Sequence, residues 1–166
     1  MPNAPEHPRQ PASPPFDSAT EYYIDHLQSS LHLNSVDYSG SAGAAVLFND
    51  RDNADWSGER WKLTEQQDGS YFITNVATGN YLVVASAAPH YASVTVAAPD
   101  AKDVQWRWVL RSSGLLGSFS LHPAITPGVA VAPKTWPYGQ GAPLHLIPFD
   151  GAGYLTHLFK VTTVAG

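Results

Sequence analysis

The chain has 166 residues, which suits a single domain with a short tail, and it carries a net charge of −5. Only 14% of its residues are charged, which disfavours a coiled coil or a charge-rich helical bundle. Lys and Arg together number 9 and form no basic cluster, and the absence of cysteine excludes disulfides, thiolate catalysis and cysteine-ligated metals.

Residues 1–15 are rich in proline and lack hydrophobic periodicity, which predicts a disordered arm before a folded domain of residues 16–166. The arm has no apolar run of the kind found in signal peptides, and no later run is long enough to span a membrane. We therefore expect a cytoplasmic protein that neither inserts into membranes nor binds nucleic acid.

From residue 16 onward, short apolar runs alternate with turn residues, which is typical of an all-β protein. Some helical propensity is present over residues 17–28, but Tyr22-Tyr23-Ile24 within it favours a strand. In chain order, the expected strands cover residues 22–24, 36–38, 45–48, 71–74, 81–85, 93–97, 106–110, 119–121, 129–132, 144–147 and 158–161.

Three landmarks recur in the same order three times along the chain, which indicates an internal repeat. They are two aromatic residues and, between them, a short apolar run at residues 45–48, 94–97 and 144–147. One aromatic residue opens each unit, and we call these the opening aromatics: Tyr22, Tyr71 and Phe119. A second large aromatic residue comes late in each unit, and we call these the closing aromatics: Trp61, Trp108 and Phe159. Each unit has room for four short strands, and we expect the closing aromatics to share one core with pseudo-threefold symmetry.

Three four-stranded units are too few for a propeller, but they suit a closed barrel capped by a triangle of hairpins. The sequence therefore predicts an all-β β-trefoil fold. The repeats are expected at about residues 18–66, 67–113 and 114–164.

The segment GSYFITNVATGNYL, from Gly69 to Leu82, resembles the opening of a repeat in ricin-B-type lectins. The Gln-x-Trp signature of that family is echoed three times, each time without the Gln, at Glu59-x-Trp61, Trp106-x-Trp108 and His157-x-Phe159. The resemblance covers residues 18–164 and is strongest to the cysteine-free, cytosolic lectins of mushrooms. It implies a non-catalytic lectin without a cofactor that binds glycans or glycoproteins, most simply of the galactose or GalNAc type. A homodimer is compatible with this assignment.

The resemblance also implies where a sugar would bind, because a working repeat supplies an Asp on its second strand and an aromatic residue after its third. The first repeat offers Asp37 next to Tyr38, and Phe48 followed by Asn49. A carboxylate accepts hydrogen bonds from paired sugar hydroxyls, and an aromatic ring stacks on the apolar face of the sugar.

Two further residues of the first repeat, Asn53 and Asp55, are candidates because Gly58 replaces the usual Asn of the family. At the positions of Asp37 and Phe48 the other repeats hold apolar residues, so we expect them to lack this sugar site. These residues are Val83 and Ala97 in the second repeat and Ala130 and Ile147 in the third. The alternative is that Asp37 only begins a turn and that Phe48 belongs to the core.

No catalytic motif is present, and neither a catalytic nor a metal site is predicted. We interpret the acidic residues Asp50, Asp52, Asp55 and Glu59 as a solvated loop rather than a glycosidase pair or a calcium site. The seven histidines have no zinc-binding spacing and are expected to be surface or packing residues.

The loop at residues 133–141 is stiffened by proline and carries Trp136 and Tyr138, which makes it an alternative binding loop unless Trp136 closes the end of the barrel. The rival function is that of a β-trefoil protease inhibitor, which would act through this loop or through the loop at residues 86–91.

Overall fold

The computed structural model describes residues 16–35, 46–49, 57–85, 93–100, 102, 104–115, 117–133, 142–149 and 155–164. These residues form strands and two short 3-10 helices, η1 (Ser57–Glu59) and η2 (Leu155–His157), and contain no α-helix. The strands are β1 (Tyr22–His26), β2 (His32–Ser35), β3 (Val46–Asn49), β4 (Trp61–Glu65), β5 (Tyr71–Asn75), β6 (Tyr81–Ala85), β7 (Val94–Ala97), β8 (Val104–Gln105), β9 (Arg107–Ser112), β10 (Phe119–Pro123), β11 (Val129–Pro133), β12 (Ala142–Pro148) and β13 (Phe159–Thr163).

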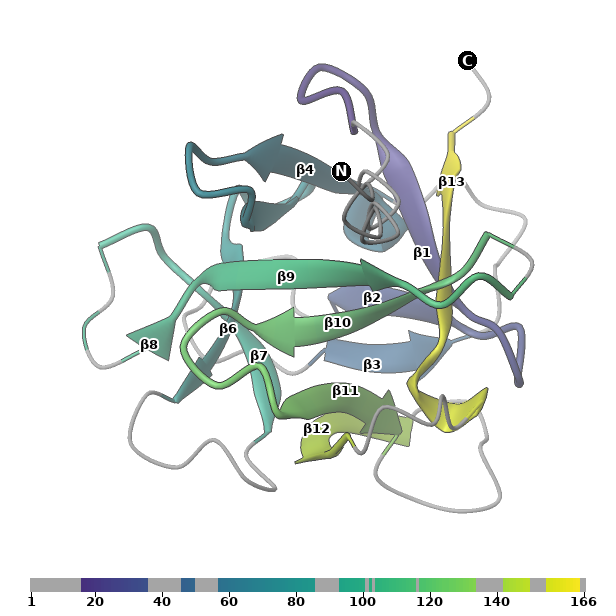
Figure 1. The fold of residues 1–166 in the computed structure, drawn as a ribbon. Coiled ribbons are helices and arrows are strands. Elements are labelled where there is room, and N and C mark those ends of the chain that lie inside the picture. The colour runs from purple at the N-terminus through teal and green to yellow at the C-terminus, as the bar shows by residue number, and fades with distance from the viewer. Residues whose placement is uncertain are drawn as a thin grey trace, which may run out of the picture.

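Six of these strands close into an antiparallel barrel (Figure 1). Strand β1 pairs with β4 and β13, β5 pairs with β4 and β9, and β10 pairs with β9 and β13. Every barrel strand therefore has a partner on both sides, which leaves no open sheet edge.

The remaining long strands form three hairpins, β2–β3, β6–β7 and β11–β12. The hairpins contact one another, because β3 pairs with β12 and Ser93, just before β7, bridges to His145 in β12. A six-stranded barrel with three connected hairpins is the β-trefoil, so the predicted fold is confirmed.

The core shows the expected pseudo-threefold symmetry. In each repeat the opening aromatic lies across the sheet from a closing aromatic, in the pairs Tyr22–Trp61, Tyr71–Trp108 and Phe119–Phe159. All three closing aromatics are fully buried, as predicted. Burial of such large rings supplies much of the hydrophobic free energy of folding.

Both indoles also fasten a hairpin to the barrel. Trp61 Nε1 donates a hydrogen bond of 3.1 Å to the carbonyl oxygen of Leu33 in β2, and Trp108 Nε1 donates one of 2.8 Å to that of Leu82 in β6. A buried N–H without an acceptor costs about 1–3 kcal/mol, so these bonds hold both hairpins in the same register against the barrel.

Phe16 lies where the three repeats meet. Its ring makes edge-to-face contacts with all three opening aromatics, with centroid distances of 5.5, 5.6 and 5.6 Å. A single residue that precedes β1 therefore packs against one residue from each repeat, which ties the start of the described chain to the barrel.

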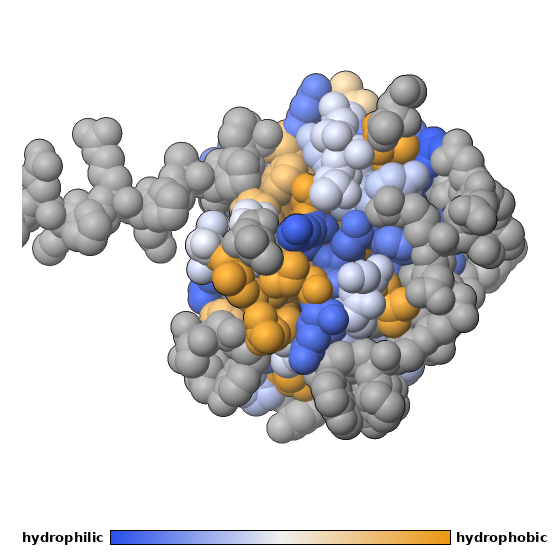
Figure 2. Space-filling model, turned by 90° about the vertical axis from the view of Figure 1, so that its right-hand side faces the viewer, coloured by the Kyte–Doolittle hydropathy of each residue, from blue (hydrophilic) through white to orange (hydrophobic). Residues whose placement is uncertain are grey.

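The surface is of mixed character. On the face in Figure 2, hydrophobic residues gather in one area beside a band of hydrophilic residues. Large hydrophobic side chains that are exposed in the described part of the chain are Leu115, Ile125 and Leu155. None of the described helices is long and apolar enough to cross a membrane.

Candidate functional site

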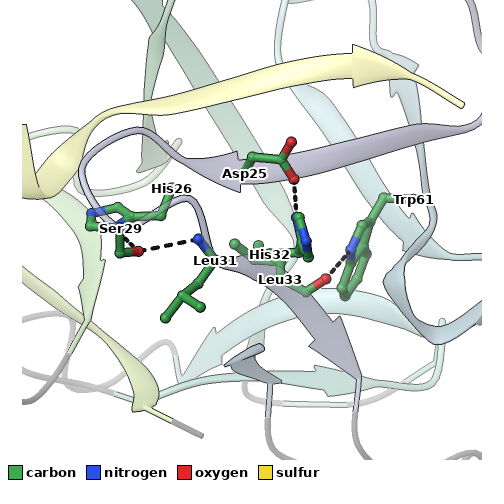
Figure 3. A network of polar contacts seen from close by, with 7 residues as sticks. All are labelled: Asp25, His26, Ser29, Leu31, His32, Leu33 and Trp61. Carbon is green, nitrogen blue, oxygen red and sulfur yellow. Dashed lines mark hydrogen bonds and ion pairs between the residues drawn. The ribbon is translucent and has the colours of Figure 1, made fainter. Parts of the chain in front are cut away.

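The first repeat holds a network of polar contacts between β1 and β2 (Figure 3). Asp25 and His32 lie opposite each other, and the Asp25 carboxylate accepts a hydrogen bond from His32 Nδ1. His26 Nε2 donates to the carbonyl oxygen of Thr156 over 2.9 Å, and His26 Nδ1 accepts from the Ser29 hydroxyl over 2.7 Å. Burial lowers the pKa of His26, so its ring is neutral at neutral pH. Its two hydrogen bonds link the end of β1 to the following turn and to η2.

The register of β2 and β6 shows which residues of the first two repeats are equivalent. Because Leu33 and Leu82 accept the same hydrogen bond from a closing aromatic, the residues that follow them, Asn34 and Val83, occupy equivalent positions. The chain thus places Asn34, rather than Asp37, at the position that holds Val83 in the second repeat.

The residue equivalent to Val83 therefore lies in β2 (His32–Ser35), whereas the strand expected at residues 36–38 lies outside the described residues. The turn after β1 is as short as the turn after β5: Ser30 N bonds to His26 O, just as Gly79 N bonds to Asn75 O. Counting residues from the opening aromatic would have found this register, whereas searching for an Asp did not.

Asn34 is buried, with 6% of its surface exposed, and its Oδ1 has no hydrogen-bond partner among the described residues. The hydroxyl of the next residue, Ser35, is also buried and likewise has no partner in the part of the chain that the structure describes. Most buried polar side-chain atoms in proteins have a hydrogen-bond partner, so a further polar group could satisfy each of these two atoms. Strand β2 lies against η1 and pairs with β3 at this place.

The third strand is also shifted relative to the expected equivalences. Phe48 lies opposite Leu33, as Val96 lies opposite Leu82, so Phe48 corresponds to Val96 rather than to Ala97. Val96 is fully buried, which makes this register position a core position in the second repeat. Asn49, opposite His32, is the residue that corresponds to Ala97.

Several predicted residues lie outside the described part of the chain: Asp37, Tyr38, Asn53, Asp55, Trp136 and Tyr138. For Phe48 and Asn49 the structure describes the backbone pairing in β3 but not the side chains. The structure thus brings the strands of the proposed site together and leaves its side chains as predictions.

One residue of the acidic group can be placed, and it differs from the solvated loop that we expected. Glu59, at the end of η1, is only 3% exposed. It precedes Trp61 by two residues, where the lectin signature has its Gln, and it is buried at that position. In the described residues, no three His, Cys, Asp or Glu side chains group as a metal site.

The third repeat also buries two histidines, His122 and His157. His122 Nδ1 lies 2.9 Å from the carbonyl oxygens of Pro127 and Val129 and donates to them, while Nε2 accepts from the Ser120 hydroxyl over 2.7 Å. Burial, aided by the positive charge of Arg111, lowers the pKa of His122 to about 4. The ring is therefore neutral and structural at neutral pH.

The second repeat carries a group of aromatic residues that the sequence reasoning missed. The rings of Tyr81 and Trp106 are stacked, with centroids 5.9 Å apart and 19° between planes, and Phe72 meets Tyr81 edge-on at 5.2 Å. A cavity of about 300 Å³ opens beside them, lined by Phe72, Val104, Gln105, Trp106 and Arg107. Because Trp106 was counted as part of the family signature, its partly exposed position beside a cavity was not predicted.

Comparison with known proteins agrees with this architecture. The designed threefold-symmetric protein ThreeFoil has a TM-score of 0.75 at 19% identity, covering 87% of this chain and 99% of its own. The Macrolepiota procera ricin B-like lectin in complex with lactose has 0.71 at 10% identity, covering 89% and 98%. The C-half of the earthworm R-type lectin in complex with GalNAc has 0.63 at 14%, covering 87% and 99%. No curated protein matches the chain.

The fold and these similarities define a β-trefoil protein with the architecture of ricin B-like lectins. Residues 16–95, which hold the first repeat and most of the second, match the family described as ricin-type β-trefoil lectin domain-like. This part of the chain is therefore similar to ricin-type lectin domains in sequence as well as in fold.

Proposed function

We propose that the protein is a non-catalytic lectin that binds glycans of the galactose or GalNAc type. The observation that carries the proposal is the match of residues 16–95 to the ricin-type lectin domain, since those residues include the whole first repeat. Two of the similar structures were determined with lactose and with GalNAc, which supports this sugar class.

The principal site is proposed in the first repeat, where β2, β3 and η1 meet. Asp37 would accept hydrogen bonds from two sugar hydroxyls and Phe48 would stack on the ring. The supporting residues of this proposal are Tyr38, Asn49, Asn53 and Asp55. Asn34 is added here, because its buried Oδ1, which has no partner among the described residues, lies next to the same strand pair and a hydroxyl group would satisfy it.

A glycan array followed by isothermal titration with the best hit tests the proposal. We expect Asp37→Ala to weaken binding by about 1.5–3 kcal/mol, the usual contribution of a hydrogen bond to a charged group, without a large change in melting temperature. Asp100→Ala is the matched control, since Asp100 is an exposed acidic residue of the second repeat. Absence of any glycan hit would overturn the function.

Asn34→Ala tests the site independently of Asp37. If both variants bind the glycan as tightly as the unmodified protein, the first-repeat site is wrong although the lectin function stands. Inhibition of papain or trypsin in the absence of glycan binding would support the protease-inhibitor alternative. Its loops at residues 86–91 and 133–141 lie, apart from Pro133, outside the described residues.

A further inference from the structure

The aromatic group of the second repeat lies on three neighbouring segments. Phe72 is on β5, Tyr81 begins β6, and Trp106 lies between β8 and β9. Strand β8 pairs with β6, with Gln105 opposite Val84, and Figure 1 shows β8 at the left edge of the molecule beside the start of β9. This pairing brings the chain back across β6 and sets the indole on the Tyr81 ring.

All three rings are partly exposed, and two of them, Phe72 and Trp106, line the cavity. Tyr81 is not one of the lining residues, so it supports the indole from outside the cavity. An indole held in this way is a rigid, flat surface, and little conformational entropy is lost when a ligand packs on it.

The polar residues that line the described part of the cavity are Gln105 and Arg107. Arg107 Nη1 donates to Asp68 Oδ2 over 3.0 Å, and Asp68 Oδ1 accepts from the hydroxyl and the backbone N–H of Ser70. These hydrogen bonds from Ser70 lower the pKa of Asp68, so the carboxylate stays ionised and balances the charge of Arg107. Among the described lining residues, the charged one, Arg107, is thus paired with a carboxylate.

The other two repeats do not share this arrangement. The residues two positions before the closing aromatics are Glu59 in the first repeat and His157 in the third, with 3% and 1% of their surface exposed. In the second repeat the same position holds Trp106, which is partly exposed and lines a cavity. The fold therefore does not require an exposed indole here, and a group of partly exposed aromatic side chains is a common feature of binding surfaces.

We infer that this cavity is a second carbohydrate subsite that accepts one neutral pyranose. The apolar face of the sugar packs on Trp106 and Phe72, and the Gln105 amide and the Arg107 guanidinium hydrogen-bond its hydroxyls. The volume of about 300 Å³ lies at the lower end of the range for small-molecule sites and suits a single sugar ring. The balanced Arg107–Asp68 pair favours a neutral sugar over an acidic one.

The subsite differs from the place where a family-type site of the second repeat would lie. That place is marked by Val83 and Val96, which are apolar and buried, with 1% and 0% exposed, and neither lines the cavity. The inference rests on the proposed lectin function for the class of ligand but not on the first-repeat site.

The test is a titration of the ¹⁵N-labelled full chain with methyl galactoside, methyl N-acetylgalactosaminide, methyl glucoside and methyl mannoside, with the indole N–H signals recorded by NMR. Trp106→Phe identifies the Trp106 signal.

We expect the Trp106 signal to shift saturably with at least one glycoside. The Asp37→Ala variant should show the same shift. Trp106→Ala should weaken this binding about tenfold or more, equivalent to about 1.4 kcal/mol. Leu115→Ala, which removes an exposed apolar side chain elsewhere, is the control and should bind normally.

The outcomes separate the two proposals. If glycans bind but the Trp106 signal is unmoved by every glycoside, the subsite is wrong and the lectin function stands. If the Trp106 signal responds only to an acidic sugar such as methyl glucuronide, the assignment to a neutral pyranose is wrong. If neither the glycosides nor the glycan array give binding, the lectin function fails together with the subsite.

Discussion

The buried His122 makes the stability of the protein depend on pH, and the size of the effect follows from its surroundings. In the folded chain the pKa of His122 is lowered from 6.5 to about 4, chiefly because burial disfavours the charged ring and also because Arg111 and His157 lie nearby. The unfolded chain therefore binds a proton at this histidine over a pH range in which the folded chain does not.

As the pH falls below about 6.5, proton uptake stabilises the unfolded state, and folding stability is lost until the pH passes the folded-state pKa. Between about pH 8 and pH 4.5 the loss at this one site is about 2.5 kcal/mol. His26, whose pKa is also lowered by burial, adds a further loss in the same direction.

Urea unfolding followed by tryptophan fluorescence at both pH values measures the effect. We expect His122→Gln to lose about 2.5 kcal/mol less than the unmodified protein between these pH values, whatever its stability at pH 8. Val129→Ala is the control, because it removes buried volume next to His122 but keeps the titrating ring, and its pH-dependent loss should equal that of the unmodified protein. Equal losses in His122→Gln and the unmodified protein would refute the reasoning.

Two further predictions concern the fold. Phe16→Ala removes edge-to-face contacts with all three opening aromatics and should cost about 2–4 kcal/mol in urea unfolding; an unchanged midpoint would mean that Phe16 does not pack on the barrel in solution. Ser30 has a φ of 60°, in a turn where the second repeat has Gly79 at 71°. Ser30→Gly should therefore stabilise the protein by about 0.5–1 kcal/mol in the same assay, whereas Gly79→Ala should destabilise it.

The lack of long helices, the threefold repeat and the closing aromatics can all be recognised in the amino-acid sequence. These features are local or periodic: turn residues interrupt the chain at short intervals, and an aromatic pair recurs once per repeat. Trp61 and Trp108 follow this rule because a large ring must be buried wherever three equivalent units share one core.

Strand register is harder to predict, since it depends on the length of a turn. Asp37 was chosen for the sugar-binding position of the second strand because a carboxylate suits sugar hydroxyls. The short turn after β1 instead places Asn34 at the position equivalent to Val83. The position of Phe48 is equally hard to predict, because only the pairing of β2 with β3 shows that it lies opposite Leu33. A shift of one residue moves a side chain to the other face of a sheet, so small errors of register change which residues form a site.

The chain by itself determined that three similar units must bury aromatic residues in a common β-barrel, because that information lies in composition and spacing. Only the tertiary structure decided that Trp106 stacks on Tyr81 and borders a cavity, while the equivalent Glu59 and His157 are buried. The physical reason is that burial is a property of the surroundings: the pairing of β8 with β6 and the neighbouring Phe72 determine whether position 106 faces the interior or the surface.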